Sequence, residues 1–210
     1  MKAFFALALA LVFAGCSTNQ VSFHKRTALS DGKTFKGWFG DTTNIWRVEN
    51  GSFTAGDGQK KIAHNEFLKT ERSFTNFVLR VKVKLLGTNG FVNGGVQIRS
   101  TVFPPFEMKG YQCDVGEGWW GALYDESRRN KVLIKPNAAD VKRAVRNGDW
   151  NDYVIRAEGK RVQTWINDVP MIDYIEADDS IPQHGLIGVQ VHGGGVTQVY
   201  YKDIMIEELP

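Results

Sequence analysis

The chain has 210 residues, with 26 Lys and Arg against 23 Asp and Glu, so its formal net charge is only +3. The near-neutral charge, with no basic cluster beyond short pairs such as Arg128-Arg129, argues against a nucleic-acid-binding protein. The length suits a single β-sandwich domain. The 22 glycines suit the many tight turns that short strands require.

The first 15 residues have the pattern of an export signal rather than of a folded element. Lys2 precedes an apolar run, Ala3 to Ala14, that is too short to remain as a membrane span. Phe13-Ala14-Gly15-Cys16 resembles the lipobox of bacterial lipoproteins, in which the cysteine carries lipid. We therefore expect a lipoprotein signal peptide over 1–15, lipidation of Cys16 and a polar tether over 16–25. Ordinary secretion with cleavage nearby is the alternative.

The residue after Cys16 bears on location. Ser17, rather than Asp, follows the cysteine. This arrangement resembles the signal that sorts Gram-negative lipoproteins to the outer membrane. We expect an exported protein that is anchored by lipid in the bacterial cell envelope, at the outer membrane. With Cys16 lipidated, Cys113 would have no disulfide partner. Cys113 falls at an inward strand position, where a thiol behaves as a small apolar group rather than a nucleophile.

The segment after residue 26 has the pattern of an all-β sandwich. Asn50-Gly51 predicts a hairpin between Trp46–Val48 and Ser52–Thr54, and Asn167-Asp168 predicts another between Arg161–Ile166 and Val169–Ile172. Other predicted strands and loops follow along the chain: strands at Glu66–Thr70, Phe74–Leu86, Val132–Lys135, Trp150–Glu158 and Val196–Leu209, and loops at Gly87–Gly95 and Phe103–Phe106.

Only one segment favours a helix. The Ala-rich residues 138–146 have Asp140 near their start and are followed by Asn147-Gly148, which predicts one short helix there. Many short strands with almost no helix indicate a single β-sandwich domain over 26–210. The sequence shows no internal repeat and no second domain.

Three predicted strands share the pattern apolar-Gln-apolar-polar. They read Val96-Gln97-Ile98-Arg99, Gln112-Cys113-Asp114 with Tyr111 before it, and Val189-Gln190-Val191-His192. With a period of two, the apolar residues face the core and the Gln residues share the other face with Arg99, Asp114 and His192. Each residue alone is more often a solvated side chain. Together, a cation, a carboxylate and an imidazole on one surface suit a polar substrate and proton transfer.

Five stretches resemble the 3-keto-disaccharide hydrolase family, formerly a domain of unknown function. The resemblance rests on blocks that occur in the family's order over nearly all of residues 26–210: Leu29–Trp38, Asn93–Ser100, Gly110–Tyr124 with Trp119-Trp120-Gly121, Gly148–Asn151 and Gly188–His192. It implies a concanavalin A-like or laminin G-like jelly roll, exported by bacteria, that cleaves glycosides already oxidised at C3. The Glu-x-Asp-x-x-Glu pattern of laminarinase-like jelly rolls is absent from this sequence.

The implied reaction assigns roles to the predicted site. A ketone at C3 acidifies the C2 hydrogen, so a base can remove it and the C1 substituent can leave by elimination, followed by addition of water. We expect His192 as base, Asp114 to orient it or to act as base itself, and Arg99 to hold the enolate or a hydroxyl. The remaining candidates are substrate-binding residues: Gln97, Gln112 and Gln190 for hydroxyls, Trp119 or Trp120 for stacking on the sugar, and Glu117 and Tyr124 at the rim.

Several alternatives stay open. No cofactor is required, although Asp114 and His192 could instead bind a divalent cation that polarises the C3 carbonyl. A second function is a non-catalytic carbohydrate-binding module, which needs the Trp and Gln residues but not a titrating His192. A third is a structural surface lipoprotein whose polar face is merely hydrated. The expected partners are an oxidised glycoside and, through the N-terminal lipid, a membrane.

Overall fold

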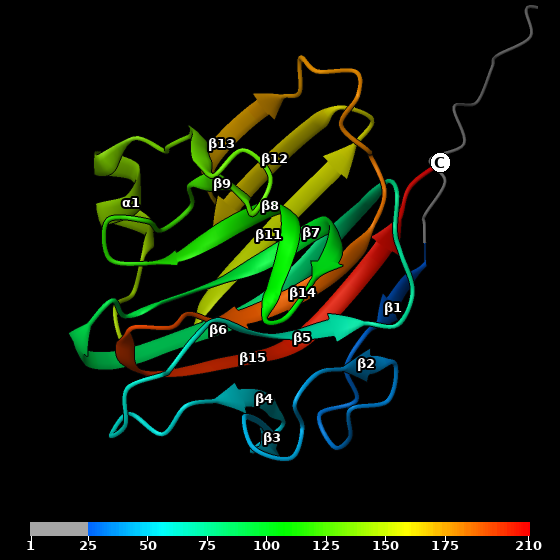
Figure 1. Ribbon diagram of the computed structural model, residues 1–210. Helices are drawn as coiled ribbons and strands as arrows, with labels where there is room; N and C mark the ends of the chain where they lie inside the picture. Colours follow the sequence, from blue (N-terminus) through cyan, green and yellow to red (C-terminus); the bar gives the residue numbers. More distant parts are fainter. Residues whose placement is uncertain (1–24) are drawn as a thin grey trace, which may run out of the picture.

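The computed structural model describes residues 25–210 and shows two facing antiparallel sheets (Figure 1). The eight-stranded sheet has the order β13-β12-β11-β6-β15-β4-β3, with β1 paired to β15. Its strands are β1 (Arg26–Ala28), β3 (Trp46–Glu49), β4 (Ser52–Ala55), β6 (Phe77–Gly90), β11 (Asn151–Glu158), β12 (Arg161–Ile166), β13 (Val169–Ile175) and β15 (Gly195–Glu208).

The seven-stranded sheet, which carries the residues of interest, has the order β10-β9-β8-β7-β14-β5-β2. Its strands are β2 (Trp38–Phe39), β5 (Glu66–Thr70), β7 (Asn93–Phe103), β8 (Glu107–Gly116), β9 (Leu123–Glu126), β10 (Lys131–Ile134) and β14 (Leu186–Val191). This architecture confirms the all-β jelly-roll prediction. Among the described residues the one helix is α1 (Ala138–Ala144), where a short helix was predicted, and it packs against β13.

The core lies between the two sheets because each long strand buries every second side chain. Strand β6 contributes Phe77, Leu79, Val81 and Val83, all at most 2% exposed. The facing sheet contributes residues of the three patterned strands, which are also buried: Val96, Ile98, Tyr111, Cys113, Val115, Val189 and Val191. The predicted inward positions are therefore confirmed, and the polar residues between them face away from the core.

Both predicted two-residue hairpins are present. Trp46–Glu49 pairs with Ser52–Ala55 across Asn50 and Gly51, and both turn residues have positive φ, 49° and 78°. The second hairpin pairs β12 with β13, and its turn residues Asn167 and Asp168 also have positive φ. Asn, Asp and Gly adopt this left-handed backbone more readily than other residues, which explains why such pairs mark these turns.

The predicted loop over Gly87–Gly95 is wrong in extent. Strand β6 continues to Gly90 and β7 begins at Asn93, so only Phe91 and Val92 form the connection. Glycine is required at Gly90, because a Cβ there would lie 2.2 Å from the carbonyl oxygen of Gly194. The tight connection places Phe91 directly before the start of β7.

Strand β7 contains an irregularity that decides which side chains share a face. Its register with β8 shifts between Ile98 and Thr101, and Arg99 has a φ of 49°. A bulge of this kind interrupts the strict alternation of side chains along a strand. The pattern that places Gln97 on the outer face therefore does not extend to Arg99.

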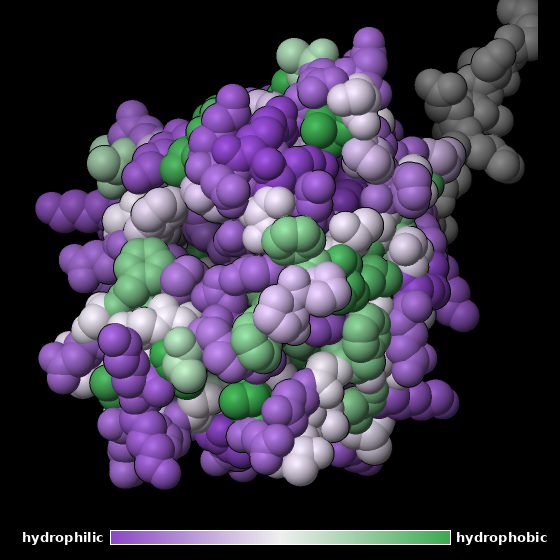
Figure 2. Space-filling view, viewed as in Figure 1, coloured by the Kyte–Doolittle hydropathy of each residue, from purple (hydrophilic) through white to green (hydrophobic). Residues whose placement is uncertain are grey.

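No helix in the described part of the chain is long and apolar enough to cross a membrane. The predicted signal peptide, the lipidation of Cys16 and nearly all of the predicted tether lie outside the described residues. The face of the molecule in Figure 2 is mostly hydrophilic, with apolar side chains in small separate patches.

Candidate functional site

A small pocket of about 140 Å³ lies on the outer face of the seven-stranded sheet. Its lining comes from strands β7, β8 and β9, from the turns before β7 and between β8 and β9, and from the residue after β14. The lining residues are Phe91, Asn93, Gln112, Asp114, Trp119, Tyr124, Glu126 and His192. We call this the polar pocket. Five of the predicted site residues meet in it, namely Gln112, Asp114, Trp119, Tyr124 and His192.

Strand pairing explains why these residues meet. Asp114 lies opposite Gly95, and Gln112 lies opposite Tyr124 of β9. Paired residues in an antiparallel sheet point to the same face. Gly95 leaves the space that the larger side chains occupy, because a Cβ at this position would lie 2.7 Å from Cγ of Gln112.

Asp114 is a buried carboxyl group with an unsatisfied oxygen. The side chain is 2% exposed; Oδ1 accepts a 2.8 Å hydrogen bond from Nε2 of Gln112, and Oδ2 has no hydrogen-bond partner among the described residues. Burial disfavours the charged form and raises the pKa of Asp114 to about 8. At neutral pH Asp114 is therefore mainly a neutral acid that can donate a proton or a hydrogen bond.

A directed chain of hydrogen bonds ends on Asp114. Ser100 Oγ donates to Gln97 Oε1 at 2.6 Å, and Gln97 Nε2 donates to Gln112 Oε1 at 3.0 Å. Gln112 Nε2 then donates to Asp114. Because all three bonds run in the same direction, they polarise one another and fix Oδ1 as the acceptor. The predicted hydroxyl-binding residues Gln97 and Gln112 thus bind each other, and Gln112 also lines the pocket.

His192 supplies a neutral imidazole. Its Nδ1 lies 2.6 Å from the carbonyl oxygen of Gly193, and a carbonyl can only accept, so Nδ1 carries the hydrogen and Nε2 keeps its lone pair. Burial lowers the pKa of His192 below its usual value. The aromatic ring of Phe91 packs edge-on at a centroid distance of 4.6 Å, which contributes to that burial. A neutral imidazole with a free nitrogen is suited to act as a base.

Glu126 is a further pocket residue, one that the sequence analysis did not select. Burial, with a smaller contribution from the charge of Glu107, raises the pKa of Glu126 to about 7. The sequence carries a signal for it, because Tyr124 and Glu126 alternate along one strand, β9, but no strand was predicted at these residues. Phe91 and Asn93 were missed for a similar reason, since the predicted loop concealed them.

Aromatic side chains form the rim of the polar pocket. Trp119 lies edge-on to Phe91 at 5.9 Å and to Tyr124 at 6.1 Å between ring centroids. The ammonium group of Lys135 lies 4.8 Å from the centroid of the Trp119 ring. Such an aromatic cluster offers apolar ring faces to a ligand next to the polar floor.

Other predicted substrate-binding residues lie elsewhere. Gln190 is on the same face as Asp114, opposite Gly95, but it is completely buried and its amide has no hydrogen-bond partner in the described part of the chain. Glu117 and Trp120 line a different, larger hollow. Gln190 therefore lies on the predicted face but does not line the polar pocket, and Glu117 lies outside that pocket. Of the two candidate tryptophans, Trp119 lines the pocket and Trp120 does not.

Arg99 does not join the polar pocket, contrary to the shared-face prediction. Its guanidinium donates to the carbonyl oxygens of Thr75 and Gly159 and to the side chains of Asn76 and Gln183. Burial lowers its pKa to about 10. The bulge at Arg99 turns the side chain away, and these contacts connect β7 to segments next to β6 and β11.

Within residues 25–210 no group of three or more His, Cys, Asp or Glu side chains is arranged to hold a metal ion. A divalent cation held by Asp114 and His192 stays an untested alternative.

The fold and the pocket define a class of protein: a jelly roll with a polar, aromatic-rimmed pocket on the outer face of one sheet. Solved structures share this fold. A candidate glycosyl hydrolase from Parabacteroides distasonis ATCC 8503 is 20% identical, with a TM-score of 0.65 over 88% of this chain and 94% of that chain. The carbohydrate-binding module CBM66 of Bacillus subtilis is 16% identical, with a TM-score of 0.64 over 82% and 96%.

A Bacillus subtilis protein with a galectin-like fold is 10% identical, with a TM-score of 0.55 over 88% of this chain and 94% of that chain. At these identities the likeness concerns the fold. No curated protein sequence matches the chain. The family model does match: residues 25–207 fit the 3-keto-alpha-glucoside-1,2-lyase-like domain, and the chain belongs to that family. The family and the fold together support a carbohydrate-related function.

Proposed function

We propose that this protein cleaves 3-keto-glycosides by removing the C2 proton and eliminating the C1 substituent, with water adding afterwards. The observation that carries the proposal is the meeting, in one small pocket, of a neutral imidazole and a carboxylic acid that stays protonated at neutral pH. Environments that push the pKa values of two neighbouring groups in opposite senses are typical of acid–base pairs.

In the first step His192 acts as the base. Its Nε2 takes the proton from C2, the C2–H electron pair forms a C2=C3 double bond, and the C3 carbonyl becomes an enolate oxygen. Asp114 donates a hydrogen bond or its proton to that oxygen, which stabilises the developing negative charge. The unpartnered Oδ2 of Asp114 is the atom available for this role.

In the second step the enolate collapses. The C3 carbonyl re-forms, a C1=C2 double bond forms and the bond from C1 to the aglycone oxygen breaks, with a proton going to that oxygen. Glu126, whose pKa is raised to about 7, is a candidate donor for this proton. Water then adds its hydroxyl to C1 and a proton to C2, so the net reaction is hydrolysis to a 3-keto sugar.

A product assay tests the proposal. The domain spanning residues 26–210 is incubated with a chromogenic 3-keto-glucoside and, in parallel, with the same glucoside unoxidised, each with and without a chelator. Release from the keto substrate alone supports C2-proton chemistry, because only the ketone acidifies C2. Release from both substrates contradicts it, and a loss of activity with chelator would favour the cation alternative.

The second candidate function is non-catalytic carbohydrate binding. It is favoured by the fold shared with the module CBM66 and by the aromatic rim of Trp119 and Tyr124. It predicts glycan affinity without release from either substrate, and binding that does not depend on His192.

We also propose export and lipid anchoring through Cys16, on the strength of the Phe13–Cys16 pattern. Expression of the full chain in a Gram-negative host with a radiolabelled fatty acid should label the wild type and not Cys16→Ala. Label in both would refute this anchor.

A further inference from the structure

Asn93 is a pocket residue that the mechanism above does not use. It is 2% exposed, and neither Oδ1 nor Nδ2 of its amide has a hydrogen-bond partner among the described residues. Buried side-chain amides usually have partners, because an unpaired polar group loses its hydrogen bonds with water and gains none in return. The Asn93 side chain also lines the polar pocket. A ligand in this pocket can therefore supply the partners that the fold does not.

Strand pairing places Asn93 directly beside His192. The backbone carbonyl of Asn93 accepts a 3.1 Å hydrogen bond from the backbone N–H of His192. On its other side Asn93 lies opposite Gly116 of β8, where a Cβ would be 2.8 Å from Nδ2 of Asn93. Gly116 thus leaves room for the amide. Asp114 lies two residues before Gly116 on the same face, so the amide shares the pocket with both reacting groups.

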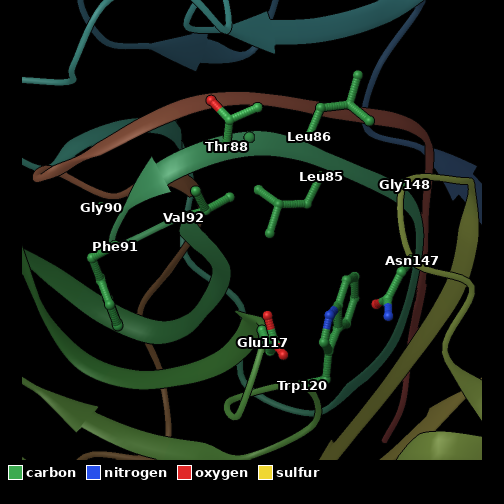
Figure 3. A pocket seen from close by; sticks show the side chains of 11 residues that line it. Leu85, Leu86, Thr88, Gly90, Phe91, Val92, Glu117, Trp120, Asn147 and Gly148 are labelled. Carbon is green, nitrogen blue, oxygen red and sulfur yellow. The ribbon is translucent and has the colours of Figure 1, made fainter.

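The larger hollow on the molecule is a separate place. Figure 3 shows Glu117 and Trp120 at this hollow, and Asn93 is not among the residues that line it. A ligand that reaches the Asn93 amide therefore lies in the polar pocket. The volume of that pocket, about 140 Å³, is below the roughly 300–1,000 Å³ of pockets that enclose drug-sized ligands, so only the reacting part of a glycoside fits there.

The amide oxygen of Asn93 needs a hydrogen-bond donor, and this requirement restricts its partner. In a 3-keto-glycoside the C3 carbonyl and the glycosidic oxygen carry no hydrogen, so only a hydroxyl group can donate to Oδ1. With the C2 hydrogen at Nε2 of His192, the hydroxyl on the same carbon lies next to Asn93. The C4 hydroxyl lies on the far side of the C3 carbonyl, which the proposed mechanism directs to Asp114. Nδ2 can donate to an oxygen on a carbon adjacent to C2, because ketone and ether oxygens both accept.

We propose that Asn93 is a specificity-determining residue that binds the C2 hydroxyl of the sugar, so that the protein selects 3-keto-glycosides with a free hydroxyl group at C2. This inference rests on the function proposed above and goes beyond it, because elimination needs the C3 ketone and a C2 hydrogen but no C2 hydroxyl. A substrate without this hydroxyl leaves Oδ1 buried and unpaired. Sites that bind a substrate hydroxyl through buried polar groups discriminate strongly against analogues that lack it.

The test compares a 3-keto-glucoside with its 2-deoxy analogue, both carrying the same chromogenic aglycone. The readout is the ratio of their kcat/KM values, 2-hydroxy over 2-deoxy. Asn93→Ala should lower this ratio at least about tenfold relative to the wild type, because it removes a contact that only the 2-hydroxy substrate makes. Since each variant is compared with the wild type, the intrinsic difference in reactivity between the two substrates cancels. The substitution removes no side-chain hydrogen bond within the described residues, so the fold should be retained.

Gln190→Met is the matched control. The Gln190 amide lies on the same face, opposite Gly95, and is also buried without a hydrogen-bond partner in the described part of the chain, but it does not line the polar pocket. Its ratio should stay within about twofold of the wild type. A ratio that Asn93→Ala leaves unchanged, because both substrates lose equally, means that Asn93 is structural and overturns the inference. An equal fall in both variants overturns it as well.

The 4-deoxy analogue tests which hydroxyl is bound. The wild type and Asn93→Ala should discriminate equally between the 4-hydroxy and 4-deoxy substrates. A fall in that ratio, with the 2-deoxy ratio unchanged, assigns Asn93 to the C4 hydroxyl and overturns the inference.

A binding measurement on the wild type needs no variant. The 3-keto form of 1,5-anhydroglucitol has no group to eliminate at C1, and it should bind at least about tenfold more tightly than its 2-deoxy form. Equal affinities overturn the inference. If the wild type cleaves no keto substrate, the proposed function fails, and this inference with it; cleavage with an unchanged ratio in Asn93→Ala refutes only the inference.

Discussion

Replacement of Asp114 by Asn should change how the stability of the protein depends on pH. The pKa of Asp114 is raised from an ordinary value of 3.8 to about 8 because the carboxyl group is buried. At pH values between these two pKa values, the folded state therefore keeps the proton on Asp114, whereas the unfolded state has released it. This group's contribution to stability is complete below the unfolded pKa and is lost as the pH rises through the folded pKa.

The size of the effect follows from linkage. Within the window between the two pKa values, one proton of difference lowers the free energy of unfolding of the wild type by about 1.4 kcal/mol per pH unit. Asn keeps an oxygen for the hydrogen bond from Gln112 Nε2 but cannot ionise. Between about pH 4.5 and pH 7.5, Asp114→Asn should thus gain about 4 kcal/mol relative to the wild type.

Urea denaturation at three pH values in this window measures the difference directly. Asp31→Asn is the control, because Asp31 is exposed and its hydrogen bonds, the largest from Thr34, lower its pKa to about 2. A lowered pKa gives stability that is lost only as the pH falls below the unfolded value, so this control should show no pH-dependent difference in the window. If Asp114→Asn also shows none, Asp114 ionises normally in the fold and cannot be the neutral acid of the mechanism.

Four further outcomes are expected. His192→Gln should lower kcat by at least about 100-fold while the melting temperature stays near that of the wild type, because general-base catalysis typically contributes a factor of this size. The acidic limb of the wild-type profile of kcat/KM should lie below about pH 6.5, since burial lowers the pKa of His192. Arg99→Ala should destabilise the fold by roughly 2 kcal/mol or more, because it removes the hydrogen bonds that this buried guanidinium donates to the carbonyl oxygens of Thr75 and Gly159. Even so, kcat/KM at permissive temperature should stay within a few-fold of the wild type; a folded variant without activity would restore Arg99 to the site. Arg129→Ala should cost roughly 3 kcal/mol in thermal or urea unfolding, because it removes the bidentate partner of the buried Glu176, and an unchanged midpoint would refute that pairing.

The alternation of side chains made much of this site predictable from the sequence. A period of two places Gln112 and Asp114 on the face opposite Cys113, and the structure shows that arrangement. The same rule failed at Arg99, because a bulge with a positive φ interrupts β7. The residue types in that strand do not predict this bulge.

Other features depend on which strands are neighbours, and a single sequence does not contain that information. Glu126 reaches the pocket because β9 pairs with β8. The hydrogen bond from Gln97 to Gln112 likewise needs the pairing of β7 with β8. The three glutamines lie on the predicted face, but the complete burial of Gln97 and Gln190 could not be foreseen from the alternation alone.

The most direct test of the central claim follows the hydrogen at C2. The protein is allowed to cleave a 3-keto-glucoside in deuterated water, and the 3-keto sugar product is examined at once by NMR, with a sample without protein to correct for spontaneous exchange. Proton removal at C2 followed by addition of water predicts that the wild type forms a product with one solvent deuterium at C2. The His192→Gln variant, which should turn over little substrate, should form correspondingly little of this deuterated product. A product that retains its original C2 hydrogen would mean that the bond at C1 breaks by direct displacement, and would contradict the mechanism.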